Sequence, residues 1–183
     1  MPSGADCLPI PRRLSMKILI PALSVVFLSS AAFAADTGSS TNAPPECPKG
    51  QVWDSSQKKC VEKKSGVSDK DLIATGRALA KSERYYEALE VLGLVQNKDP
   101  VALTYIGYSL RKSGQTEEAI GFYHQALAID PSNADTREYL GEGYVASGKL
   151  DLAKAELKKI GEICGTKCEQ YALLESAIAS AVN

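Results

Sequence analysis

Residues 100–133 read PVALTYIGYSLRKSGQTEEAIGFYHQALAIDPSN, and this stretch decides how the rest of the chain is interpreted. Gly114 separates two segments of helical spacing, because glycine readily adopts the positive φ that the end of a helix favours. Thr116 then starts the second segment with a hydroxyl, and two acidic residues follow near the positive end of the helix dipole. Pro131 ends that segment, since proline cannot continue a helix. The stretch therefore predicts two antiparallel helices.

Small and large side chains alternate where these two helices are expected to cross. Gly107 and Ala119 would allow the backbones to approach closely, while Tyr123 would fill a wider gap. With these residues in place, the stretch resembles a nearly complete tetratricopeptide repeat (TPR). The resemblance implies a helical hairpin that stacks on others of its kind to form a scaffold for binding other chains.

The same pattern recurs less completely on both sides, over residues 69–99 and 134–163. The first of these units is shorter than the central one, which predicts a tighter exit turn, and apolar residues at helical spacing after Cys168 predict a closing helix. The repeat-defining residues of the three units are Gly76, Ala88, Gly107, Ala119, Tyr123, Ala126, Pro131, Gly141 and Ala153.

These units predict an all-α fold, in which about three helix-turn-helix TPR units and a C-terminal capping helix form a short solenoid over residues 69–183. A small Cys-closed hairpin over residues 47–61 is expected to precede the solenoid. Residues 36–46 are small, polar and proline-containing, which is typical of a flexible linker.

Residues 1–35 have the pattern of a signal peptide. Basic residues precede an apolar segment at 18–28, and a small-x-small cleavage pattern follows at 32–34. We therefore expect an exported protein, periplasmic or secreted, with no stable membrane span after cleavage. Three alternatives remain open: an uncleaved anchor, twin-arginine export through Arg12 and Arg13, and a start at Met16.

Cleavage would remove Cys7 and leave four cysteines. An even number in an exported chain favours disulfides. Of the three possible pairings, proximity favours Cys47–Cys60 and Cys164–Cys168. A zinc site and a redox-active pair at Cys164 and Cys168 are the alternatives. Both are disfavoured, because the chain has one histidine and these cysteines lack Cys-x-x-Cys spacing.

The segment around Trp53 suggests a second possible function. Its Cys-Pro-x-Gly start, aromatic-Asp pair and closing cysteine are similar to one hairpin of small invertebrate chitin-binding modules, although the other cysteines of those modules are missing. That similarity implies a glycan-stacking role for Trp53. The competing interpretation places Trp53 against its own disulfide or against the repeats.

Catalysis is not expected. The only histidine, His124, should lie on the surface of a repeat helix, and the sequence has no phosphate-binding glycine loop, His-Glu-x-x-His or Gly-x-Ser-x-Gly motif. The chain has 21 basic and 22 acidic residues, so it lacks the charge excess typical of nucleic-acid binding. No cofactor and no metal are expected.

The TPR resemblance implies that the first helix of each unit lines a concave groove. Basic residues there could pair with acidic or C-terminal carboxylate groups, and tyrosines could act as anchors. Ile73, Glu138 and Val145 fall on further groove positions. The residues expected to bind a partner are Arg77, Lys81, Thr104, Tyr105, Tyr108, Arg111, Lys112, Tyr139 and Glu142.

The sequence thus predicts a non-enzymatic protein–protein interaction scaffold in an exported compartment, with a protein or peptide partner of unknown identity. The alternative is a cell-wall or carbohydrate-binding protein that uses the Cys47–Cys60 hairpin and Trp53.

Overall fold

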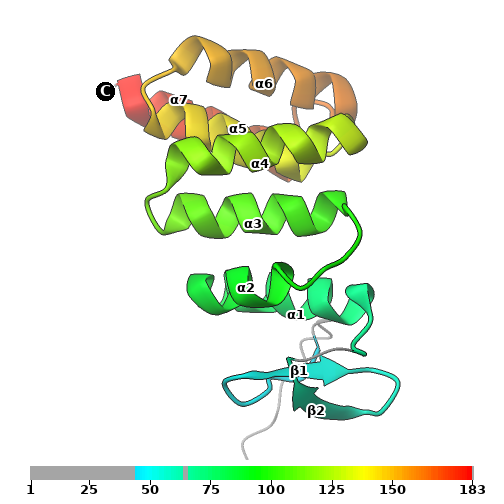
Figure 1. Cartoon of the computed structure of the whole chain (residues 1–183). Coiled ribbons are helices and arrows are strands. Elements are labelled where there is room, and N and C mark those ends of the chain that lie inside the picture. The colour runs from blue at the N-terminus through cyan, green and yellow to red at the C-terminus, as the bar shows by residue number, and fades with distance from the viewer. Residues whose placement is uncertain (1–43, 64–65, 183) are drawn as a thin grey trace, which may run out of the picture. The chain divides into compact units, whose positions relative to one another are not determined.

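The computed structural model describes residues 44–63 and 66–182 of the chain (Figure 1). The predicted signal peptide lies outside these residues, as does the predicted linker apart from residues 44–46. The elements in chain order are β1 (Gln51–Asp54), β2 (Lys59–Glu62), α1 (Asp69–Lys81), α2 (Tyr85–Leu92), α3 (Pro100–Lys112), α4 (Thr116–Ile129), α5 (Ala134–Ala146), α6 (Leu150–Cys164) and α7 (Glu169–Val182).

Strands β1 and β2 form the predicted hairpin. They pair antiparallel, and the carboxylate of Asp54 holds the turn by accepting hydrogen bonds from the backbone N–H groups of Ser56 and Gln57 at 2.9 and 3.0 Å. Val52 is fully buried and packs with Leu72 of α1 and Val91 of α2. One face of the hairpin therefore covers the first helix pair.

The helices pack as successive antiparallel pairs, α1 with α2, α3 with α4 and α5 with α6, and α7 packs against both α5 and α6 (Figure 1). This arrangement confirms the predicted solenoid of three helix pairs and a closing helix. Gly107 lies at the crossing of its pair as expected, because a Cβ atom there would come within 2.7 Å of the Tyr123 ring.

A glycine with positive φ follows two of the three first helices. Gly114 (φ +89°) comes after α3 and Gly148 (φ +71°) after α5. The equivalent position after α1 is occupied by Glu83, which adopts the same left-handed conformation (φ +62°). The chain reverses direction in the same way at all three places, although only two of them carry the residue that favours it.

The prediction of a tighter exit turn from the first unit is wrong. The first unit is shorter because its second helix is short: α2 has 8 residues, whereas α4 has 14 and α6 has 15. The connection that follows is long, and Asp69 holds it by accepting hydrogen bonds from the backbone N–H groups of Gln96 and Asn97 at 3.1 and 3.2 Å.

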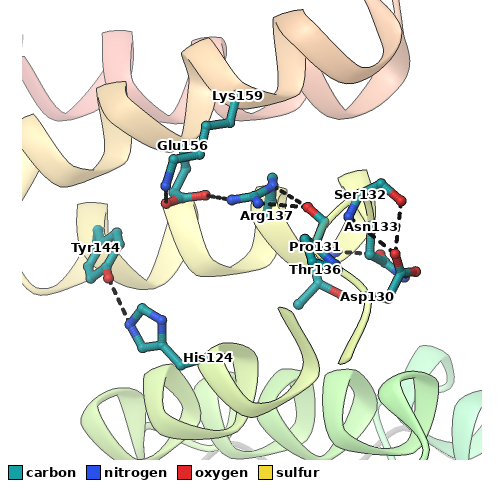
Figure 2. A network of polar contacts seen from close by, with 10 residues as sticks. All are labelled: His124, Asp130, Pro131, Ser132, Asn133, Thr136, Arg137, Tyr144, Glu156 and Lys159. Carbon is teal, nitrogen blue, oxygen red and sulfur yellow. Dashed lines mark hydrogen bonds and ion pairs between the residues drawn. The ribbon is translucent and has the colours of Figure 1, made fainter. Parts of the chain in front are cut away.

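Polar contacts fix the third helix pair to the turn before it (Figure 2). Arg137 of α5 forms an ion pair with Glu156 of α6 at 2.6 Å, and Lys159 approaches the same carboxylate at 2.7 Å. The Arg137 guanidinium also donates two hydrogen bonds to the carbonyl oxygen of Pro131, at 3.0 and 2.7 Å. One side chain thus ties α5, α6 and the α4–α5 turn together.

Candidate functional site

A cavity of about 470 Å³ lies among α1, α3, α5 and α7, and we call it the four-helix cavity. These are the first helices of the three pairs together with the closing helix. Of the predicted groove residues, the cavity brings together Arg77, Lys81, Tyr105, Tyr108, Lys112, Glu138, Tyr139 and Glu142. It adds four further lining residues, Asp135, Glu169, Gln170 and Leu173.

Three tyrosines form the aromatic part of the wall, and Lys81 lies over all of them. Its ammonium nitrogen is 5.8, 4.9 and 5.2 Å from the ring centroids of Tyr105, Tyr108 and Tyr139. The same ammonium group donates a hydrogen bond of 2.7 Å to the Tyr139 hydroxyl. Cation–π attraction and this hydrogen bond hold the lysine at the cavity wall.

Burial raises the pKa of the hydroxyls of Tyr105, Tyr108 and Tyr139. The three phenols therefore remain neutral over the whole physiological pH range. A neutral phenol is both a hydrogen-bond donor and an acceptor, so this part of the wall can recognise polar groups of either kind.

Basic side chains gather on the α1 and α3 side of the cavity. The Arg77 guanidinium lies 5.4 Å from the Tyr105 ring centroid, and the Lys112 ammonium lies 5.7 Å from that of Tyr108. Both residues are exposed. They can therefore meet an incoming anionic group without breaking an ion pair of their own.

Acidic side chains gather on the opposite side, on α5 and α7. Asp135 accepts a hydrogen bond from Gln170 of α7 at 2.7 Å, and Glu142 forms an ion pair with Arg111. Glu138 lies between them in sequence and is only 4% exposed. Burial, reinforced by the neighbouring Glu142 carboxylate, raises the pKa of Glu138 to about 8.

Four of the predicted groove positions do not line the cavity. Ile73 and Val145 are instead partly buried and pack against the hydrophobic core. Thr104 is buried, and its hydroxyl donates a hydrogen bond of 2.7 Å to the carbonyl oxygen of Pro100 and lies 2.7 Å from the hydroxyl of Thr136 on α5, with which it also forms a hydrogen bond. Arg111 is held behind the wall by its ion pair with Glu142 and lies beside the buried hydroxyl of Tyr123. Thr104 and Arg111 support the wall from behind.

Sequence reasoning missed Asp135 and the three residues of α7. Asp135 stands in the first turn of α5, and α7 was expected only to cap the solenoid. The signal available was the spacing of Glu169, Gln170 and Leu173, which places them on one side of a helix. Because α7 lies against α5, this side continues the row of first helices.

Sequence comparison gives a match over part of the chain. The profile of the family described as "Tetratricopeptide repeat" matches residues 110–178. No curated protein sequence matches the chain.

Several solved structures resemble the helical part. PcrH in complex with the chaperone binding region of PopB has 18% identity and a TM-score of 0.52, over 61% of this chain and 92% of that one. The first TPR of Spaghetti (RPAP3), bound to an HSP90 peptide, has 18% identity and a TM-score of 0.55, over 63% and 94%. The type III secretion translocator chaperone SycD of Yersinia enterocolitica has 19% identity and a TM-score of 0.54, over 64% and 91%.

The fold is a TPR solenoid. In these terms, α1, α3 and α5 are the first helices of three TPR units, and α7 takes the place of the first helix of a fourth. The four-helix cavity is therefore the inner groove of the TPR solenoid, closed at one end by α7.

Outside the groove, one disulfide closes the β1–β2 hairpin and a second lies between α6 and α7 of the TPR solenoid. Cys47 is bonded to Cys60, with Cα atoms 5.7 Å apart, and Cys164 to Cys168, with Cα atoms 5.9 Å apart. Trp53 is half-buried and stands opposite Cys60 in the strand register, so the two side chains share the hairpin face that does not carry Val52. This position favours packing of Trp53 on its own disulfide.

The one histidine of the chain lies outside the four-helix cavity. His124 is exposed, as predicted, and forms a hydrogen bond of 3.0 Å with the hydroxyl of Tyr144 (Figure 2). In the part of the chain that the structure describes, no three His, Cys, Asp or Glu residues are grouped closely enough to hold a metal ion. None of the helices within residues 44–63 and 66–182 has the length and apolarity that a membrane span requires.

Proposed function

We propose that this chain is a non-catalytic scaffold that binds a segment of a partner protein in the four-helix cavity. The observation that carries the proposal is the cavity wall itself, where three tyrosines and Lys81 meet between four helices. Tyrosine is enriched at the residues that dominate binding energy in protein interfaces. The helical neighbours support this function, since PcrH and the first TPR of Spaghetti were solved with a bound partner region or peptide.

The partner segment is proposed to be extended or helical, with an anionic group directed toward α1 and α3. Arg77 and Lys112 are exposed on that side and have no carboxylate partner in the part of the chain that the structure describes. A carboxylate of the partner would gain charge-assisted hydrogen bonds there. Arg111 is less suited to this role, because Glu142 already occupies its guanidinium.

Cross-linking of the protein in its native compartment, followed by mass spectrometry of the captured material, tests this proposal. The groove variant combines Arg77→Glu, Lys112→Glu and Tyr108→Ala. A charge-matched control carries the same three kinds of change on second helices, at exposed positions outside the cavity: Lys154→Glu, Lys158→Glu and Tyr86→Ala.

We expect the unaltered protein and the control variant to capture the same partner, and the groove variant to lose it. Capture that is equal in all three proteins would overturn the groove as the binding site. Circular dichroism spectra of the three proteins should coincide, because every substituted residue except Tyr108 is exposed.

We further propose that the protein is exported, to the periplasm or the cell exterior, and that both disulfides form there. Four paired cysteines in a small chain suit an oxidising compartment. Export and disulfide formation are tested together by intact-mass spectrometry of the protein, isolated from its host and alkylated without reductant. We expect the loss of residues up to the 32–34 cleavage pattern and no alkylated cysteine. A full-length mass, or alkylation at Cys164 or Cys168, would contradict them.

A further inference from the structure

Glu138 is the buried acidic residue of the four-helix cavity that lacks a polar partner among the described residues. Its side chain lines the cavity, it is 4% exposed, and it forms no hydrogen bond or ion pair with any residue that the structure describes. The neighbouring acids differ in this respect, because Glu142 is paired with Arg111 and Asp135 accepts a hydrogen bond from Gln170. Burying a carboxylate without a partner is costly.

The cations near Glu138 are already engaged elsewhere. Arg111 of α3 is directed to Glu142, and Lys81 of α1 donates to the Tyr139 hydroxyl at 2.7 Å. Both influence Glu138 through space, but neither contacts its carboxylate. The cavity around Glu138 therefore has room and unmet charge for a cation from outside the chain.

We propose that Glu138 binds the cationic side chain of a lysine or arginine in the partner segment, on the α5 and α7 side of the four-helix cavity. This inference rests on the proposed function, since it assigns the chemistry of the partner at one place in that cavity. Glu169 of α7 lines the same side and adds negative charge. Leu173 offers an apolar surface on which the methylene stem of the incoming side chain can lie.

The charge distribution of the wall agrees with this assignment. Basic residues occupy the α1 and α3 side, and acidic residues occupy the α5 and α7 side. A partner cation placed among Arg77 and Lys112 would be repelled, and the same cation beside Glu138 is attracted. A metal ion is a poorer occupant, because the described residues hold no group of three metal-ligating side chains.

The inference also predicts a pH dependence. The groups around Glu138 are Asp135 and Glu142 on its own helix, Lys81 on α1, Arg111 on α3 and Glu169 across the cavity on α7. Because burial raises the pKa of Glu138 to about 8, the carboxyl is largely protonated at about pH 6 and ionised at about pH 9. An arginine stays charged over this range, so its binding should strengthen as the pH rises.

Selection from a random peptide library displayed on phage, using the purified full-length chain as bait, supplies the probes. Peptides that bind the unaltered protein and fail to bind Tyr108→Ala are retained. We expect them to share a lysine or arginine at one position. The best arginine peptide and its copy with norleucine at that position are then synthesised, and their affinities are measured by calorimetry.

For the arginine peptide at about pH 9, where Glu138 is ionised, we expect Glu138→Gln to weaken binding about tenfold, the effect of losing one charge-assisted hydrogen bond. The norleucine peptide should bind both proteins within about twofold, since it has no cation to lose. Glu118→Gln, an exposed change on α4, is the matched control and should leave both affinities unchanged. The rise in arginine-peptide affinity between about pH 6 and about pH 9 should disappear in Glu138→Gln.

The outcomes separate the two proposals. If no selected peptide depends on Tyr108, the proposed function fails and this inference fails with it. If peptides depend on Tyr108 but carry no shared basic residue, or bind Glu138→Gln as tightly as the unaltered protein, the assignment to Glu138 is overturned while the groove function stands. Matching circular dichroism spectra of Glu138→Gln and the unaltered protein exclude a loss of folding as the cause.

Discussion

Helices α5 and α7 pack closely at Gly141, because this residue has no side chain. A Cβ atom there would lie 2.4 Å from the side chain of Leu174, which is fully buried. We therefore expect Gly141→Ala to lower the unfolding free energy by about 1–3 kcal/mol through overpacking. Gly121→Ala is the control, because a Cβ at that exposed helical glycine meets nothing within 4 Å.

Urea denaturation of the two alanine variants and the unaltered protein provides the comparison. Gly121→Ala should be neutral or more stable by up to about 1 kcal/mol, since alanine favours helix over glycine. Equal stability of Gly141→Ala and Gly121→Ala would show that α5 and α7 are not packed as closely as described.

Glu138 is expected to affect stability as well as binding. In the unfolded chain its carboxyl has an ordinary pKa near 4.5, and in the folded protein the pKa is raised to about 8 by burial. Between these two values the folded state holds more protons than the unfolded state, so the unfolding free energy falls as the pH rises. Glutamine does not ionise, so the unfolding free energy of Glu138→Gln should not fall with rising pH for this reason.

We expect the unfolding free energy of Glu138→Gln to exceed that of the unaltered protein by about 1 kcal/mol or more at about pH 9. At about pH 5 the difference in unfolding free energy should be much smaller. Thermal unfolding at both pH values gives the difference, and the exposed Glu118→Gln shows the effect of removing a carboxylate outside the cavity. A gap of the same size at both pH values would contradict the raised pKa.

At the scale of elements, helix α7 both completes the hydrophobic core and lines the four-helix cavity, and two adjacent leucines serve these two roles. Leu174 is fully buried in the core formed with α5 and α6, whereas Leu173 is 47% exposed and lines the four-helix cavity. Leu174→Ala should cost about 2–5 kcal/mol of unfolding free energy because it leaves a cavity in the core. Leu173→Ala should cost less than about 1 kcal/mol and should instead weaken binding of groove peptides.

Chemical denaturation and peptide titration of both variants check this division. The opposite pattern, with Leu173→Ala the more destabilising change, would place the core on the other side of α7.

At the scale of the whole molecule, the disulfides constrain the chain on both sides of the helical pairs. The Cys47–Cys60 bond spans 13 residues, and a bond closing a loop of that size contributes about 3 kcal/mol on the chain-entropy model. We expect Cys47→Ser with Cys60→Ser to lower the melting temperature. The smaller loop of 4 residues between Cys164 and Cys168 should contribute less. Calorimetry of the two double variants ranks them, and a larger loss from the shorter loop would contradict this reasoning.

Most of the fold could be predicted from the sequence because the repeat pattern depends on local residues. Gly107 and Tyr123 reveal a helix crossing by their sizes alone, and Gly114 reveals the turn between two helices. The short α2 could not be predicted, because the loop that replaces its last turn is held by Asp69, a residue far away in the sequence.

The candidate site was predicted less completely, since its wall depends on which helices lie side by side. The family spacing points to Lys81, Tyr108 and Glu142, and the structure brings all three into one cavity. The same spacing includes Thr104, whose side chain is instead buried against Thr136. The spacing of Glu169, Gln170 and Leu173 places them on one side of α7, but that this side faces the cavity follows only from the packing of α7 against α5.

Every residue that lines the four-helix cavity belongs to α1, α3, α5 or α7, and none belongs to α2, α4 or α6. The second helices therefore offer attachment sites that lie outside the cavity. A fluorophore or a surface linker attached at Gln125, an exposed residue of α4, would leave the cavity open on an immobilised protein. The same separation permits redesign of the outer helices for solubility or expression without altering the inner wall.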